Sequence, residues 1–243
     1  MAVDAALLRS GAEGGPPTLR LYRWRVPTVT LGRYQPRSEV DAGACERLGI
    51  DVVRRATGGR GVLHDDELTY SIVASPVCGL PRGVRASYEY LGRALVAAYA
   101  RLGVQAQLTA SRRGRKGSAA CYLSATQADL SLEGAKLSGS AQVWSDGTCL
   151  QHGSFVIARD TAREAEVFRL DAEAAGALDR EAVTILGATG RRPGLEELAA
   201  AVAGGFADAL GAVLEPDALS QSEQEAARSM CASFRSPAED VRA

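Results

Sequence analysis

The sequence lacks several features that mark whole classes of protein. Its apolar runs are too short to cross a membrane, and no charged amino-terminal region precedes a hydrophobic stretch as in a secretory signal. The 28 basic and 29 acidic residues nearly cancel, so there is no basic excess for general binding to nucleic acid or to membrane surfaces. We therefore expect a cytoplasmic protein that binds neither nucleic acid nor membranes.

Cysteine and histidine are too scarce to indicate a disulfide framework or a metal centre. The five cysteines are an odd number without a C-x-x-C pair, which is typical of reduced thiols. The two histidines are His64 and His152. Cys149 and His152 have a metal-like C-x-x-H spacing, but on a strand they would face opposite sides of the sheet. We therefore expect no metal site.

The pattern along the 243 residues predicts an α+β fold, with a mixed, largely antiparallel sheet flanked by helices and a helical C-terminal segment. The expected domains are a catalytic domain over 1–215 and a C-terminal helix and tail over 216–243. The expected strands are 19–24, 28–34, 51–54, 61–64, 68–74, 104–108, 128–132, 135–143 and 148–157, with turns at Glu133-Gly134 and Ser145-Asp146-Gly147 joining the last three. The expected helices are 3–10, 40–48, 88–102, 195–210 and 221–230.

The most informative run is RRATGGRGVLHD, from Arg54 to Asp65, which lies between two strand-like segments. Its adjacent glycines, Gly58 and Gly59, allow positive φ and leave backbone N–H groups open to close approach by another molecule. The arginines add charge-assisted donors for a phosphate, carboxylate or carbonyl. An ordinary hairpin turn is the alternative, but such a turn needs neither the arginine pair nor the histidine that follows.

A second candidate centre combines Cys121 with Lys136. Cys121 follows a basic loop rich in small residues, where a thiol can be reached, and Lys136 lies on a strand that could fold back beneath it. An ammonium close to a thiol favours the thiolate, which is the form that attacks acyl groups. The alternatives are a buried, inert cysteine and a solvated lysine.

Taken together, these segments resemble the catalytic domain of the biotin and lipoate protein ligase superfamily, and within it the LipM-type octanoyltransferases. The resemblance covers nearly the whole chain. It rests on VVRRATGGRGVLHDDELTYSIV (52–73), Cys121, EGAKLSGSAQ (133–142), LQHGS (150–154) and the helical end with LEPDALSQSE (214–223). The first motif is typical of the superfamily, and the cysteine with the lysine strand is typical of the branch.

The resemblance implies transfer of an octanoyl group from octanoyl-acyl carrier protein to a lysine of the glycine cleavage H protein or another lipoyl domain. Cys121 would carry the acyl thioester, and Lys136 would favour its thiolate and hold the acyl carbonyl. Thioester exchange followed by aminolysis needs no ATP, so we expect no cofactor. The residues expected to bind substrate are Arg55, Thr57, Gly58, Gly59, Arg60, His64, Ser138 and Gly139.

Four other functions stay open. An ATP-dependent lipoate–protein ligase shares the arginine–glycine loop, but it needs no cysteine at position 121 and typically has Gly-Asn where Glu67 and Leu68 stand here. An octanoyl-H-protein amidotransferase would use the same acyl-cysteine. A biotin–protein ligase would have its glycine–arginine motif before the Arg-Arg-Gly-Gly motif. A non-catalytic module that binds acyl groups or lipoyl domains could keep the fold.

Two further segments carry expectations. The basic loop from Arg112 to Lys116 could steer the docking of an acidic acyl carrier protein, although an ordinary solvated loop is an equal alternative. Residues 1–4 resemble a point inside the family's first helix, and Ala5 replaces its usual acidic residue. We expect from this either a start site further upstream or the loss of an edge strand.

Overall fold

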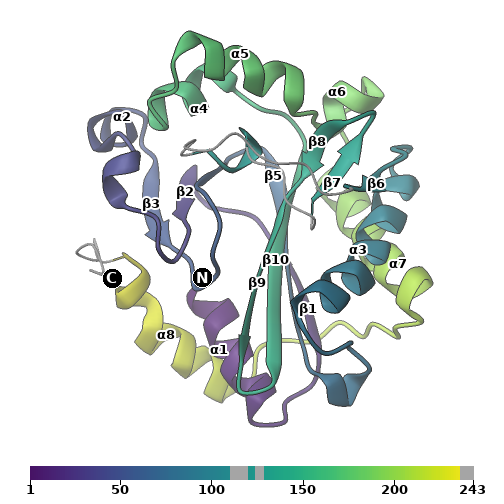
Figure 1. Cartoon of the computed structure of the whole chain (residues 1–243). Coiled ribbons are helices and arrows are strands. Elements are labelled where there is room, and N and C mark those ends of the chain that lie inside the picture. Colours follow the sequence, from purple (N-terminus) through teal and green to yellow (C-terminus); the bar gives the residue numbers. More distant parts are fainter. Residues whose placement is uncertain (110–119, 124–128, 236–243) are drawn as a thin grey trace.

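Four antiparallel strands form the largest sheet in the computed structural model, which describes residues 1–109, 120–123 and 129–235 (Figure 1). Across this sheet the order is β1 (Thr18–Tyr22), β5 (Glu67–Ala74), β10 (Thr148–Val156) and β9 (Ser140–Ser145). The turn between β9 and β10 is Asp146–Gly147, with φ of 48° and 77°, as a two-residue hairpin turn requires. The sequence predicted this turn.

Two three-stranded sheets lie beside the large one. In the first, β2 (Thr28–Leu31) pairs in parallel with β3 (Asp51–Arg54) and antiparallel with β4 (Val62–His64). The second is antiparallel and contains β6 (Gln107–Leu108), β7 (Leu130–Leu132) and β8 (Ala135–Ser138). The predicted α+β class with a mixed, largely antiparallel sheet is therefore confirmed.

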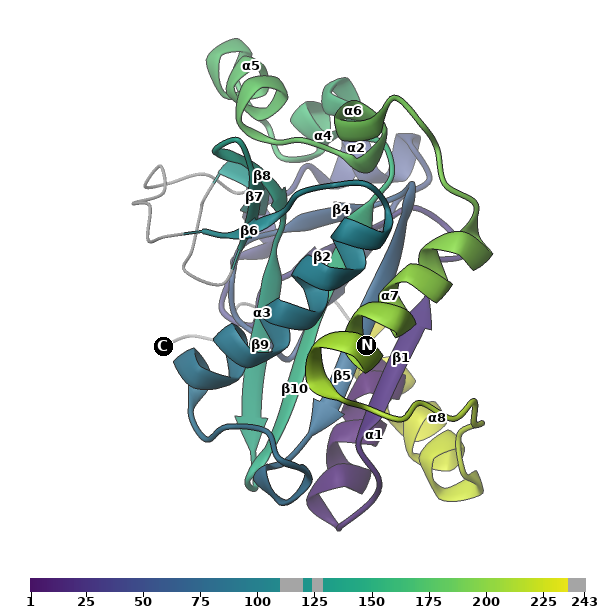
Figure 2. The same ribbon diagram turned by 90° about the vertical axis from the view of Figure 1, so that its right-hand side faces the viewer.

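Alternating residues of β5 and β10 give the large sheet two different faces. Tyr70 and Phe155 point to the face covered by α3 (Val84–Arg101) and α7 (Leu195–Leu210), and all four elements share the main apolar core (Figure 2). Thr69 and Ser154 point to the other face, where the candidate site lies. Each large apolar side chain buried in this core contributes about 1.5–3 kcal/mol.

The remaining helices cover the other face and one end of the molecule (Figure 1). They are α1 (Ala2–Ala12), α2 (Ala42–Arg47), α4 (Thr161–Val167), α5 (Ala172–Glu181), α6 (Ile185–Thr189) and α8 (Gln221–Arg235), with short 3-10 turns at Arg37–Glu39, Pro76–Cys78 and Cys121–Leu123. Helix α8 packs against α1 through Ala6, Ala226 and Ala227. Among the described residues, no helix is long and apolar enough to span a membrane. The division after residue 215 stays a prediction.

One predicted strand is wrong. The sequence analysis expects a single strand over 135–143, whereas the structure has β8 and β9, which belong to different sheets and are separated by Gly139. A Cβ on Gly139 would lie 3.2 Å from both Asp129 Oδ1 and Lys136 Cε, so the chain passes closely over these two side chains as it changes sheet. Several bounds also differ: the expected strands 104–108 and 28–34 are shortened to Gln107–Leu108 and Thr28–Leu31, and the expected helices 88–102 and 221–230 are Val84–Arg101 and Gln221–Arg235.

Candidate active site

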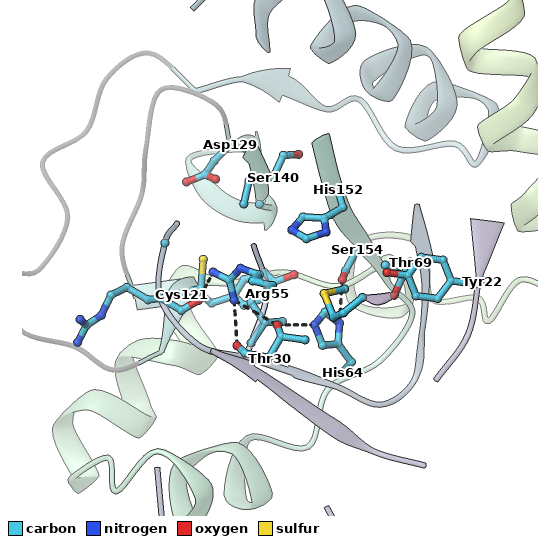
Figure 3. Close-up of a pocket in the computed structure, with 18 residues that line it drawn as sticks. Tyr22, Thr30, Arg55, His64, Thr69, Cys121, Asp129, Ser140, His152 and Ser154 are labelled. Carbon is cyan, nitrogen blue, oxygen red and sulfur yellow. Dashed lines mark hydrogen bonds between the residues drawn. The ribbon is translucent and has the colours of Figure 1, made fainter. Parts of the chain in front are cut away.

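The structure brings Cys121 and Lys136 together (Figure 3 shows Cys121). Cys121 begins a 3-10 turn, and its backbone N–H donates to the carbonyl of Gly61 at 2.8 Å, which fixes the turn against the glycine-rich loop. Lys136 is on β8, and its Nζ lies 3.7 Å from Cys121 Sγ and 3.1 Å from the carbonyl oxygen of the same residue. The buried ammonium therefore lies within reach of the sulfur and of any negative charge that develops on it.

Asp129 holds the lysine from the other side. Its Oδ2 lies 2.9 Å from Lys136 Nζ, and the two side chains are only 2% and 5% exposed. Burial alone would lower the pKa of Lys136, but the charges of Cys121 and Asp129 together raise it above its ordinary value. Lys136 is therefore an ammonium at neutral pH.

The sequence analysis missed Asp129, although a signal for it was present. The turn Glu133–Gly134 was predicted, and its two residues have φ of 51° and 87°. Counting back from this turn pairs Ser131 with Lys136, and a bulge between Leu130 and Ser131 then pairs Leu130 with Ser138. Asp129 therefore lies at the end of the ladder, within reach of Lys136. An acidic residue at that end of the hairpin was a candidate partner for Lys136.

A cavity of about 110 Å³ extends from Cys121 between the large sheet and the β2–β4 sheet. Its floor includes Ser154, Thr69 and Tyr22, which are opposite one another on β10, β5 and β1 and therefore share one face. Thr30 and His64 line it from the second sheet. Cys121 lies at one end of this group of side chains and Tyr22 at the other (Figure 3). The cavity can take an elongated group attached to the thiol.

Arg55 stabilises the glycine-rich loop from inside the protein. Its Nη2 donates to the carbonyls of Gly58 and Arg60 at 2.8 Å, its Nε donates to Thr57 Oγ1 at 3.1 Å, and its Nη1 donates to the carbonyl of Thr30 at 2.9 Å. The guanidinium lines the cavity, yet each of its nitrogens is already bonded to protein. Its role in this structure is to shape the loop.

The same loop is packed closely against the turn after β2. A Cβ on Gly32 would lie 2.0 Å from the carbonyl oxygen of Gly59, so the approach of the two backbones requires a glycine at position 32. Arg54, the first arginine of the pair, donates from Nη1 to the carbonyls of Gly32 and Gln35, at 2.8 and 2.6 Å. The two consecutive arginines thus hold two neighbouring loops in place.

His64 belongs to a buried network that the sequence analysis did not anticipate. Its Nδ1 lies 2.7 Å from Glu67 Oε1, its Nε2 lies 2.9 Å from Thr30 Oγ1, and its ring stacks on Trp24 with centroids 4.7 Å apart. Glu67 also accepts from Ser154 Oγ at 2.8 Å. This network holds the cavity wall together across both sheets.

Glu67 gives the fold an acid-sensitive component. Burial alone would raise the pKa of Glu67, but His64 and the hydroxyls of Thr69 and Ser154 outweigh it and lower the pKa below its ordinary value. Because the folded protein binds the proton less readily than the unfolded chain, this stabilisation is complete above the unfolded pKa of about 4.3 and is lost as the pH falls through the folded pKa.

Replacing Glu67 with glutamine is therefore expected to lower the free energy of unfolding by about 1.5–3 kcal/mol at pH 7. The variant should also lose less stability than the wild type on acidification below about pH 4.3. Urea unfolding at a series of pH values measures both effects. Glu89→Gln, in an exposed i,i+4 pair with Arg85, is the control and should change little. Parallel pH curves for wild type and Glu67→Gln would contradict this account.

The other residues expected to bind substrate divide into two groups. Gly59, Arg60 and Gly139 line the cavity, as do Arg55, His64 and Cys121. Thr57, Gly58 and Ser138 do not line it: Thr57 Oγ1 lies 2.7 Å from His152 Nε2, Gly58 accepts from Arg55, and Ser138 Oγ donates to the carbonyl of Ser154 at 2.9 Å. The basic loop from Arg112 to Lys116 lies outside the described residues.

The C-x-x-H pair is divided between the two faces of β10, as expected. Cys149 packs in the main core, whereas His152 lines the cavity. Burial lowers the pKa of His152 below its ordinary value, so the ring is neutral at pH 7. Among residues 1–109, 120–123 and 129–235, no group of three or more histidine, cysteine, aspartate or glutamate side chains could hold a metal ion.

The chain is similar to known proteins over most of its length. The family model of the lipoyl protein ligase A/B catalytic domain matches residues 1–207. The octanoyltransferase LipM of Kyrpidia tusciae is 38% identical over 248 residues, covering 96% of this chain and 90% of that protein. The octanoyltransferase LipM of Symbiobacterium thermophilum is 38% identical over 243 residues, covering 95% and 88%.

Two solved structures have the same fold. A bipartite lipoate protein ligase from Thermoplasma acidophilum superposes with a TM-score of 0.80 at 23% identity, over 98% of this chain and 89% of that one. A lipoate-protein ligase A bound with ATP superposes with a TM-score of 0.78 at 24% identity, over 94% and 87%. At these identities, the likeness establishes the arrangement of the elements.

Proposed function

Because the chain belongs to the lipoyl protein ligase A/B catalytic-domain family, and within it to the octanoyltransferases named LipM, we propose that it transfers an octanoyl group through Cys121 to a lysine of a lipoyl-accepting protein. The protein is thus an acyltransferase of protein lipoylation. The donor that we propose is octanoyl-acyl carrier protein, and the acceptor is the glycine cleavage H protein or another lipoyl domain.

One observation carries the proposal: a thiol beside a buried ammonium at the end of an elongated cavity. Cys121 Sγ and Lys136 Nζ are 3.7 Å apart, and Cys121 also lines the cavity that runs toward Tyr22. A ligase that activates its substrate with ATP has no need of a nucleophile at this point. The arrangement supports covalent transfer through the cysteine.

In the first step, the Cys121 thiolate attacks the carbonyl carbon of the octanoyl thioester. A new sulfur–carbon bond forms, the sulfur–carbon bond to the donor breaks, and the donor leaves as a thiolate that takes a proton. The bonds made and broken are similar, so the step needs positioning and a reactive thiolate more than an added base. The octanoyl chain then occupies the cavity.

In the second step, the acceptor lysine attacks the Cys121 thioester as a free amine. A carbon–nitrogen bond forms, the Cys121 thiolate departs, and the proton lost by the amine can pass to this thiolate. A thiolate is a better leaving group than an amide nitrogen, so the tetrahedral intermediate collapses toward the amide product. No bond to phosphate is made or broken in either step.

Lys136 acts in this scheme as a fixed positive charge. Because Asp129 and Cys121 raise its pKa, Lys136 keeps its proton and does not serve as a general base. Its charge favours the thiolate before each attack and after each collapse. A fixed ammonium in a buried site is also suited to stabilise the oxyanion of the tetrahedral intermediate, together with open backbone N–H groups.

The proposal is tested by intact-mass analysis of the wild-type protein with two donors. Octanoyl-acyl carrier protein should give an octanoyl adduct on the enzyme, and subsequent addition of the H protein should move the octanoyl group to its lysine. Labelling of the acceptor from free octanoate and ATP, without an enzyme adduct, would overturn the proposal in favour of a ligase. An adduct formed from octanoyl-H protein but not from the carrier protein would indicate an amidotransferase.

A further inference from the structure

A buried arginine packs directly behind the turn that carries the nucleophile. Arg159 lies between β10 and α4, and its side chain is 9% exposed. Its guanidinium carbon is 3.8 Å from the centroid of the Tyr122 ring. Tyr122 follows Cys121 in the 3-10 turn and is itself 5% exposed. The sequence analysis did not single out either Tyr122 or Arg159 for a role in the site.

Arg159 is held in this position by a second buried charge. Its Nη1 donates to Glu164 Oε2 at 2.6 Å, and the Glu164 side chain is 4% exposed. Glu164 is on α4, whose first turn is capped by the carboxylate of Asp160. The ion pair therefore holds the guanidinium against α4, and the Asp160 cap fixes the residue at which this helix begins. A planar cation over an aromatic face is attracted to the ring, and the attraction is stronger in a site shielded from water.

The Tyr122 ring lies near both this cation and Lys136. Lys136 Nζ is 5.5 Å from the same ring centroid, on a side chain that also reaches Cys121 Sγ. The separation of 3.7 Å between nitrogen and sulfur is within the range of a hydrogen bond to sulfur, and an outward movement of the turn would weaken this contact. The position of the Tyr122 ring thus affects how close the thiolate lies to its counter-charge.

A small cavity beside the Tyr122 ring gives it room to move if Arg159 is removed. The cavity has a volume of about 20 Å³ and is bounded by Tyr122, Arg159, Glu164, Leu63 and Val156, among others. Truncating the arginine would enlarge this space and leave the Glu164 carboxylate buried without its partner. Interiors relax only partly around such defects, and the nearest side chains shift into them.

We propose that Arg159 is a positioning residue for the nucleophile: through the ring of Tyr122 it holds the 3-10 turn so that the Cys121 thiolate stays beside Lys136. The inference rests on the proposed function in taking Cys121 as the nucleophile. Arg159 does not line the cavity at Cys121, so it acts without touching the acyl group. Its loss should slow the chemistry of the thiol and leave donor binding unchanged.

The test compares Arg159→Met, Arg159→Lys and Arg163→Met. Arg163 is a matched control because it is a nearby arginine on α4 that pairs with Asp65 at 2.7 Å. The first readout is the rate at which iodoacetamide alkylates Cys121 in the native protein, relative to the exposed Cys78 and Cys231 of the same molecules. The second readout is the split between kcat and KM for acylation by octanoyl-acyl carrier protein.

Arg159→Met should slow the relative alkylation of Cys121 and lower kcat by about 10-fold, with KM unchanged. Arg159→Lys keeps a cation over the ring and should recover most of both rates, whereas Arg163→Met should match the wild type. If Arg159→Met does not fold, the double variant Arg159→Met/Glu164→Gln, which leaves no unpaired carboxylate, takes its place in the same comparison.

If Arg159→Met had the same Cys121 alkylation ratio and the same kcat as the wild type, the inference would be overturned. So would an equal loss in Arg163→Met, because it would reflect damage to α4 as a whole. Failure of the proposed function has a different signature, since wild-type protein would then form no octanoyl adduct. The alkylation comparison decides the role of Arg159 in either case, because it needs no acyl donor.

Discussion

Replacement of Cys121 by alanine is expected to abolish the octanoyl adduct and to reduce transfer to the acceptor protein by roughly 10³-fold or more, because no other group can take over a covalent step. The side chain is partly exposed at the end of the cavity and makes no contact on which the core depends, so the fold should be retained. Intact-mass analysis after incubation with octanoyl-acyl carrier protein measures the first effect, and a discontinuous assay of acceptor octanoylation measures the second.

Other cysteines supply the controls for this experiment. Cys78 and Cys231 are exposed and lie away from the cavity, so Cys78→Ala and Cys231→Ala should form the adduct at the wild-type rate. Cys45 and Cys149 are buried, and burial raises the pKa of both thiols, that of Cys149 to about 12. Neither is suited to react. A stable octanoyl adduct on Cys121→Ala would contradict the assignment of the nucleophile.

Replacement of Lys136 by methionine is expected to produce two separate losses. An ammonium about 4 Å from a thiolate interacts with it by up to about 4 kcal/mol at an effective dielectric constant of 20, so acylation should slow by about 10²–10³-fold. Removing the ammonium also takes this counter-charge away from the buried Asp129 carboxylate, which should lower the free energy of unfolding by about 3–5 kcal/mol. Acyl-transfer assays quenched at a series of times measure the acylation rate, and urea unfolding measures the free energy of unfolding.

The double variant Lys136→Met/Asp129→Leu separates chemistry from stability. It replaces the buried ion pair with apolar groups of similar volume, a change that is often neutral or stabilising. Its free energy of unfolding should therefore return to near the wild-type value, while its acylation rate should stay as low as that of Lys136→Met. Recovery of activity together with stability would show that Lys136 is needed for the fold and not for the reaction.

Much of the fold could be predicted because local chemistry determines it. The turns at Glu133–Gly134 and Asp146–Gly147 need residues that tolerate positive φ, and these residues are visible in the sequence. Helix α7 has the predicted bounds, Leu195–Leu210, since a long apolar period is the strongest helix signal. The strand over 135–143 was wrong because alternation shows that a segment is extended, but does not show which sheet it joins.

In the site, too, residues that a local motif marks could be predicted, whereas residues whose role depends on distant contacts could not. Cys121 and Lys136 could be singled out from residue types and motifs, and the structure places them 3.7 Å apart. Asp129 and Glu67 were missed because their importance depends on which side chains the strand register places opposite them. Arg55 was expected to face a ligand, but its donors are satisfied by the loop, since the direction of a guanidinium depends on carbonyls up to 25 residues away.

The anchoring of the catalytic turn has a consequence for how the protein is made. Cys121 is tied to Gly61, 60 positions earlier in the chain, and β8, which carries Lys136, pairs at that residue with Ala182, which comes much later. Contacts between such distant segments form late in folding because loop closure must precede them. We therefore expect a nascent or misfolded chain to carry an ordinary cysteine, and the proposed reactivity of Cys121 toward acyl donors to arise only with the completed tertiary structure.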